Sequence, residues 1–133
     1  NNLPFDPDLV VEGDFSDAGG YAAMQQLILK KPDAVFATSD VMAVAAIRAL
    51  LEAGYKVPED VAIIGFDDIP LASRSIPALT TIRQPINLVG TGAVKMLVDM
   101  IEHPSAETRS LVLSTELIIR TSCGEELVKV QEK

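Results

Sequence analysis

The sequence predicts an α/β fold in which a mostly parallel sheet is flanked by helices. Two short and wholly apolar runs, Ala34–Ala37 and Val61–Ile64, are typical of strands that are buried on both faces. The segment between them is predicted to be a helix, and strands that alternate with helices favour parallel pairing with crossover connections. The chain has 133 residues, of which 48% are hydrophobic and 23% charged. This composition fits one globular domain with a core of its own.

The first elements follow from capping residues and apolar spacing. A short strand is expected at Leu9–Val11, and a helix is expected from Ser16 or Asp17, which offer capping oxygens, to about Lys31. Pro32 ends that helix. Its apolar stripe comprises Tyr21, Met24, Leu27 and Ile28.

The central helix is expected at Val41–Ala53, directly after the first apolar strand. Ser39 and Asp40 can both cap its N-terminus, and Gly54 supplies its end. Only Arg48 and Glu52 carry charge on this helix, so we expect both of its sides to be covered.

The pattern changes after Asp68. Ile69–Ala78 contains two prolines and is expected to be irregular, and Leu79–Arg83 is expected to be a strand. Asn87 can cap a helix that ends at about Glu102, and Leu111–Thr121 is expected to be extended. The apolar face of this last helix comprises Val89, Ala93, Met96, Leu97 and Met100.

Composition and single residues argue against several functions. The net charge is −8, and the eleven cations are scattered, whereas a nucleic-acid surface needs clustered Lys and Arg. Cys123 and His103 are the only residues of their kinds, so a disulfide within the chain, a cysteine metal site and a serine–histidine triad are not expected. No apolar run approaches the roughly 20 residues that span a membrane. We therefore expect no metal, no cofactor and no membrane association.

Polar and aromatic residues follow three of the expected strands. They are Asp14-Phe15-Ser16, Ser39-Asp40 and Asp67-Asp68. In open α/β sheets, ligands bind outside the carboxyl ends of the strands, so these residues predict a small-molecule site at one edge.

Simpler interpretations remain open for some of these residues. Ser16, Ser39 and Asp40 could serve only as helix caps, and Phe15 could serve only in packing. Asp67 has no such explanation, since no helix obviously begins there. Adjacent carboxylates can also hold magnesium in phosphate-transfer domains, but no lysine follows any of the expected strands. The sequence therefore does not support an enzyme.

Four motifs in order carry a family resemblance. Ala34–Leu50, Gly54–Val61, Ile64–Pro70 and Pro77–Pro85 resemble the C-terminal part of LacI/GalR-type transcriptional regulators. The similarity runs in register from about Leu9 to Ser122. It implies a periplasmic-binding-protein-like core of type I, made of two α/β subdomains and preceded by a helix-turn-helix domain, of which this chain is a partial piece.

The resemblance also implies roles for individual residues. Phe15 is expected to stack on the effector, Asp67 to bond its hydroxyls or ring nitrogens, and Gln84 to line the cleft. Ser39 stands where the family often has asparagine at an effector contact.

A homodimer is also implied by the resemblance. The expected interface uses the helix at Val41–Ala53 and the segment after Asp68. The residues assigned to this interface are Val44, Arg48, Ile69 and Arg74.

The resemblance divides the chain into parts. Residues 1–122 are expected to belong to the effector-binding and dimerisation domain, within which residues 86–110 belong to the other subdomain. Residues 123–133 are expected to form a charged tail.

The function implied is sensing of a sugar-like or nucleobase-like effector by a cytoplasmic transcriptional regulator. Operator DNA would be contacted only through a headpiece that this chain does not contain. The alternative is a periplasmic sugar-binding protein of a transport system.

Overall fold

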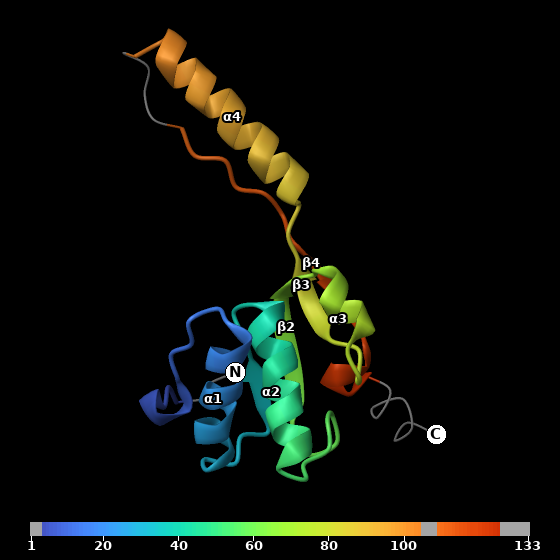
Figure 1. Cartoon of the computed structure of the whole chain (residues 1–133). Coiled ribbons are helices and arrows are strands. Elements are labelled where there is room, and N and C mark those ends of the chain that lie inside the picture. Colours follow the sequence, from blue (N-terminus) through green and yellow to red (C-terminus); the bar gives the residue numbers. More distant parts are fainter. Residues whose placement is uncertain (1–3, 105–108, 126–133) are drawn as a thin grey trace.

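Four strands form one mixed sheet in a computed structural model that describes residues 4–104 and 109–125 (Figure 1). Their order is β1 (Ala34–Phe36), β2 (Ala62–Asp67), β3 (Thr80–Arg83) and β4 (Glu116–Ile118). The first three strands run parallel, and β4 is antiparallel to β3. The mostly parallel α/β sheet predicted from the sequence is therefore confirmed.

The helices are α1 (Asp17–Ile28), α2 (Asp40–Glu52), α3 (Pro70–Arg74) and α4 (Ile86–Glu102). Short 3-10 helices lie at Pro7–Leu9 and Thr121–Cys123. In Figure 1, α1 and α2 lie side by side against the sheet. Ser39 caps α2 as expected, since its hydroxyl accepts a hydrogen bond from the Met42 N–H at 3.3 Å.

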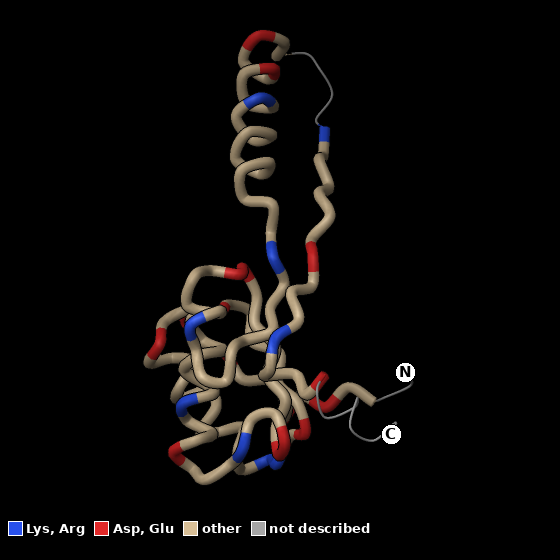
Figure 2. The backbone as a smooth tube through the Cα atoms, turned by 90° about the vertical axis from the view of Figure 1, so that its right-hand side faces the viewer, with Lys and Arg blue, Asp and Glu red and all other residues tan. Residues whose placement is uncertain are grey.

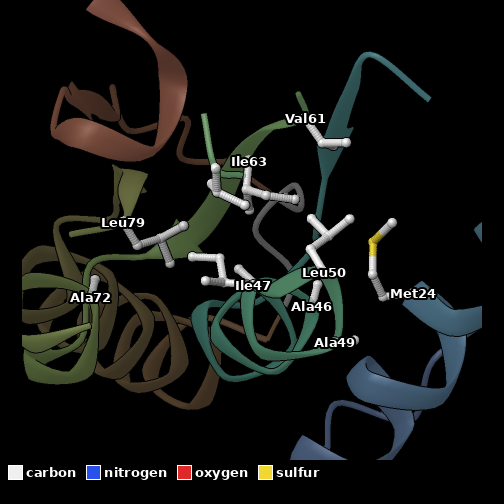
Figure 3. Packing of buried hydrophobic residues seen from close by; sticks show 11 residues of the cluster. Met24, Ala46, Ile47, Ala49, Leu50, Val61, Ile63, Ala72 and Leu79 are labelled. Atoms are coloured by element: carbon white, nitrogen blue, oxygen red, sulfur yellow. The ribbon is translucent and has the colours of Figure 1, made fainter. Parts of the chain in front are cut away.

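The hydrophobic core lies between the sheet and α2 (Figure 3). Ile63 of β2 and Leu79 before β3 meet Ile47 and Leu50 of α2, and all four side chains are buried. Met24 of α1 joins the same cluster from the side of α2 that faces α1.

The packing of α1 on α2 is close. A Cβ on Gly20 would lie 2.5 Å from the Met42 Cα, so only glycine fits there. α2 contacts α1, β2 and α3, so much of the covering expected for this helix comes from within the chain.

Two elements near the N-terminus differ from the sequence prediction. The strand expected at Leu9–Val11 is wrong: Asp6 caps a 3-10 turn at Pro7–Leu9, and the Val10 N–H closes that turn on the Pro7 carbonyl. α1 ends at Ile28 and not at about Lys31.

The region after β2 also differs. The segment expected to be irregular contains α3, which begins at Pro70, where a missing N–H costs nothing. Asn87 does not cap α4, which begins one residue earlier, after Pro85.

α4 extends away from the rest of the fold. The chain leaves the sheet after β3, forms α4 and returns as an extended segment to β4 (Figures 1 and 2). None of the described residues of α4 is buried. Within residues 4–104 and 109–125, no helix is both long and apolar enough to cross a membrane. Most of the tail expected at residues 123–133 lies outside the described residues.

Candidate functional site

Asp67 and Gln84 meet at the carboxyl ends of two neighbouring parallel strands. Asp67 ends β2 and pairs in register with Arg83, the last residue of β3, so that Gln84 is the next residue beyond. The Gln84 side-chain amide donates to Asp67 Oδ1 at 2.8 Å. These two predicted effector contacts are therefore brought together by the sheet register.

The backbone at this strand end has an unusual conformation. Asp67 and Asp68 have φ angles of 116° and 56°, in the left-handed region that only glycine adopts readily. Such residues cost about 1–3 kcal/mol each and persist only where the surrounding structure holds them. Positions of this kind cluster at binding sites, which is consistent with a functional role for this turn.

Asp68 holds two arginines from later parts of the chain. Its carboxylate lies 2.6 Å from Arg83 Nε and 2.6 Å from Arg120 Nη2, and its side chain is only 7% exposed. Arg83 also pairs with Glu116 at 3.3 Å. Burial alone would raise the pKa of Asp68, but the hydrogen bonds and charges of the two arginines outweigh burial and lower it. Asp68 therefore joins β2, β3 and the chain after β4.

Asp40 is a fully buried carboxylate beneath this turn. Its two oxygens accept hydrogen bonds from the Ile69 N–H at 2.9 Å and from the Thr81 hydroxyl at 2.5 Å. Burial raises the pKa of Asp40, and the nearby charges of Asp67 and Asp68 act in the same direction, against the two hydrogen bonds.

Phe15 is exposed at the start of α1 and has a φ of 62°. The turn around it is fixed by Asp14, which accepts hydrogen bonds from the N–H and the hydroxyl of Ser16, while Ser16 Oγ caps α1 by accepting from the Gly19 N–H. Because Leu9–Val11 is not a strand, Phe15 does not follow a strand of the sheet. Ser39 is buried at the α2 N-terminus.

A hollow of about 460 Å³ opens at the Asp67–Gln84 pair. Asp68, Arg83 and Pro85 line it as well, together with residues 86–88. Phe15 and Ser39 do not line this hollow. A second hollow of about 280 Å³, mostly apolar, lies between α1, α2 and the end of β1. The structure thus joins two of the four predicted effector contacts and leaves the other two apart from them.

The residues predicted for a dimer interface lie on α2 and around α3. Arg48 is exposed, yet it already binds Asp17 at 2.7 Å, and its guanidinium lies 5.1 Å from the ring centroid of Tyr21. Arg74 is exposed, whereas Val44 and Ile69 are partly buried.

Neither strand-end carboxylate is arranged for a metal ion. Asp67 is bonded to an amide and Asp68 to two arginines. Among the residues that the structure describes, no group of three His, Cys, Asp or Glu side chains could hold a metal ion.

The sequence did not reveal two residues of this site. The sequence places Asp40 at the predicted ligand-binding edge or as a helix cap, but it does not indicate the contact with Thr81, which lies 41 residues further along. Arg120 was not singled out, although a lone cation after the apolar run Leu117–Ile119 was a usable signal.

Comparisons with known proteins identify relatives in sequence. The pattern of the periplasmic binding protein-like domain matches residues 1–123. The HTH-type transcriptional regulator CelR of Thermobifida fusca is 43% identical over 122 residues, which cover 90% of this chain and 36% of CelR. The HTH-type transcriptional repressor PurR of Aliivibrio fischeri is 38% identical over 130 residues, which cover 95% of this chain and 39% of PurR.

Solved structures show the same similarity. The complex of the regulator CelR with cellobiose has a TM-score of 0.85 at 43% identity, covering 90% of this chain and 37% of that one. The lac repressor dimer bound to operator and the anti-inducer ONPF has a TM-score of 0.76 at 32% identity, covering 84% and 40%. The chain therefore spans between 36% and 40% of the length of these relatives.

Proposed function

Because the chain belongs to the periplasmic binding protein-like domain family and corresponds to part of the effector domain of LacI-family regulators, we propose that it binds a small polar effector for such a regulator. The observation that carries this proposal is the pairing of Asp67 and Gln84 at the carboxyl ends of β2 and β3.

The chemistry of this pair suits a hydroxyl-bearing or ring-nitrogen ligand. Asp67 keeps a second carboxylate oxygen as an acceptor, and Gln84 keeps its carbonyl oxygen and one amide hydrogen. A sugar or a nucleobase offers donors and acceptors at matching positions. CelR has been solved with cellobiose, which supports a sugar among these classes.

Phe15 and Ser39 complete the proposed effector site. The ring of Phe15 is 66% exposed, so one face is free to stack on a flat ligand or a sugar ring. Ser39 is a weaker candidate, because its hydroxyl already caps α2. In this proposal Phe15 and the Asp67–Gln84 pair contact the same effector molecule.

The wider role is that of an effector-sensing and dimerising part of a regulator. The relatives CelR and PurR are transcriptional regulators, which favours this role over a periplasmic sugar-binding protein. Operator DNA would be bound in the cytoplasm by a helix-turn-helix domain outside this chain. The engaged carboxylates of the site support binding over catalysis.

The dimer surface proposed here includes Val44, Arg48, Ile69 and Arg74. The lac repressor structure is a dimer, which supports an equivalent pairing. Arg74 is the freest of these four residues to meet a partner, since Arg48 is already held by Asp17.

The test is Asp67→Asn in a chain that also carries the rest of the effector domain. Titration calorimetry with cellobiose, ribose and purine bases first identifies a ligand. The variant should then bind that ligand more weakly by about 1–3 kcal/mol, as expected for a lost charge-assisted hydrogen bond, with little change in melting temperature. Asp60→Asn is the matched control, because Asp60 lies just before β2 and accepts a hydrogen bond from the Lys56 N–H. A large loss of stability with unchanged affinity would contradict the proposal.

A further inference from the structure

Asp40 is the one fully buried carboxylate among the described residues, and it has no direct place in the proposed effector site. It does not cap α2, because Ser39 already accepts the hydrogen bond from the Met42 N–H. Its oxygens instead bond the Ile69 N–H and the Thr81 hydroxyl, which belong to two other parts of the fold. A buried carboxylate is costly unless it is fully paired, so its presence calls for a function.

The bond to the Ile69 N–H holds the turn that carries Asp67. Ile69 directly follows Asp67 and Asp68, the two residues with positive φ. Two attachments fix this turn: Asp68 is held by arginines on one side, and the Ile69 backbone is held by Asp40 on the other. Loss of the second attachment leaves the turn free to relax toward ordinary φ values.

The bond to the Thr81 hydroxyl fixes Asp40 against the sheet. Thr81 is buried in the middle of β3, three residues before Gln84. Asp40 therefore connects the turn after β2 to β3, the strand that Gln84 directly follows. This arrangement sets the position of Asp67 relative to Gln84.

Gly65 provides the space that Asp40 needs. A Cβ at Gly65 would collide with Asp40 Oδ1, and it would lie 2.8 Å from Leu79 Cδ2. Gly65 lies two residues before Asp67 on β2 and is buried. The strand that ends in Asp67 is thus shaped to admit the carboxylate that holds the following turn.

We propose that Asp40 is a positioning residue for effector binding: by holding the Ile69 backbone against Thr81, it places the Asp67 carboxylate where it meets Gln84. This inference rests on the proposed function for its biological meaning. The geometry that it asserts can be measured without any effector.

The experiment follows the side-chain amide of Gln84 by ¹H–¹⁵N NMR in the 133-residue chain. The signals of Gln84 are identified by their loss in Gln84→Glu, and the exposed Gln25 and Gln26 give the positions of free side-chain amides. In Asp40→Ala, the Gln84 signals should move to those free positions, because Asp67 is no longer held at 2.8 Å.

A conservative variant should rescue the contact. In Asp40→Asn, the side-chain oxygen can still accept from the Ile69 N–H, and the Thr81 hydroxyl can turn to accept from the new amide. The Gln84 signals should therefore stay near their wild-type positions. The control variant is Asp60→Ala, which removes a carboxylate that also accepts a backbone hydrogen bond. Asp60 lies before the start of β2, at the opposite end of that strand from Asp67 and its partner Gln84.

The outcomes separate a positioning role from a merely structural one. If Asp40→Ala folds with a lower melting temperature but leaves the Gln84 signals in place, the proposal is wrong. If Asp40→Ala does not fold, Thr81→Val takes its place: a shift of the Gln84 signals supports the proposal, and unmoved signals contradict it. Failure of Asp67→Asn to weaken effector binding would contradict the proposed function and leave this NMR result unaffected.

Discussion

Arg120 Nη2 lies 2.6 Å from Asp68 Oδ1, and this ion pair joins residues that are 52 positions apart in the chain. The same guanidinium donates to the Leu79 carbonyl at 2.7 Å. Arg120 thereby connects the chain after β4 to the residue that follows β2 and to the residue that precedes β3. The chain that follows β4 is thus held by the carboxylate of Asp68, which is adjacent to the predicted effector contact Asp67.

Removing the Asp68 carboxylate should destabilise the fold. Asp68→Asn leaves Arg120, whose side chain is only 18% exposed, without its ionic partner. The expected loss in the free energy of unfolding is about 2–4 kcal/mol, at the lower end for a broken buried pair because Arg83 is half exposed. Urea denaturation measures it.

The matched control is Asp8→Asn, which breaks an ion pair with Lys30 in which both side chains are well exposed. Exposed pairs contribute little to stability, so this variant should be close to wild type. Equal losses in the two variants would show that the Asp68 pairs carry no special weight.

The pKa of Asp68 predicts a loss of stability in acid. The folded chain holds this pKa below the ordinary value of 3.8, because the arginine hydrogen bonds and charges outweigh burial. The stability that Asp68 contributes is present above pH 3.8 and is lost as the pH falls through the lower, folded pKa. The difference in unfolding free energy between wild type and Asp68→Asn should therefore shrink over that acid range.

For Asp40 we predict the opposite dependence of the unfolding free energy on pH. Burial raises its pKa above 3.8, so its favourable contribution is full below pH 3.8 and is lost as the pH rises through the folded pKa. The difference between wild type and Asp40→Asn should therefore decrease with rising pH. Urea titrations of both variants across the same pH series test the pair, and parallel profiles would contradict the two assignments.

Gly65→Ala should destabilise the protein, whereas Gly90→Ala should not. The added methyl at Gly65 would displace the Asp40 carboxylate and crowd Leu79, an overpacking that costs about 1–3 kcal/mol. At Gly90, in α4, nothing lies within 4 Å of the added methyl, and alanine favours a helix over glycine by about 0.5–1 kcal/mol. Thermal denaturation of both variants gives the comparison, and a harmless Gly65→Ala would refute the close fit.

The sequence predicted the sheet better than it predicted the site. The apolar run Val61–Ile64 predicted β2, and Ser39 predicted the start of α2. Both predictions succeeded because buried strands and helix caps depend on residues that are neighbours in the sequence. The strand predicted at Leu9–Val11 is wrong because this apolar run begins inside a capped 3-10 turn.

At the site, Asp67 followed from its place after a strand, while Gln84 was indicated only by the family resemblance. The role of Asp40 depends on the pairing of β2 with β3, since that register brings Thr81 beside Gly65. A long-range contact of this kind leaves no periodic pattern in the sequence.

The exposed face of α4 predicts self-association. Leu97 and Met100 are 58% and 57% exposed, and few charged residues interrupt the helix (Figure 2). α4 does not fold back onto the sheet, so its apolar side chains gain burial only from another surface, at roughly 1.5–3 kcal/mol for each large side chain.

Light scattering over a concentration series should therefore show assemblies larger than one chain. Leu97→Glu combined with Met100→Glu should shift the mass toward the monomer. Gln25→Glu combined with Gln26→Glu, an exposed double change on α1 and outside α4, serves as the control. An unchanged mass in the double variant would mean that α4 does not drive association.

The antiparallel pairing of β4 with β3 makes the whole α4 excursion a loop between two adjacent strands. Arg83 and Glu116 face each other in register, so a tight turn could join them directly and convert β3 and β4 into a hairpin. Such a shortened chain would keep Ile63, Leu79 and the core helix α2, because none of them depends on residues 84–115 for burial. It would also keep Asp68 between Arg83 and Arg120, while losing Gln84 and the apolar surface of α4. The fold thus consists of a packed α/β unit and an inserted arm, and the two ends of that arm lie side by side at Arg83 and Glu116.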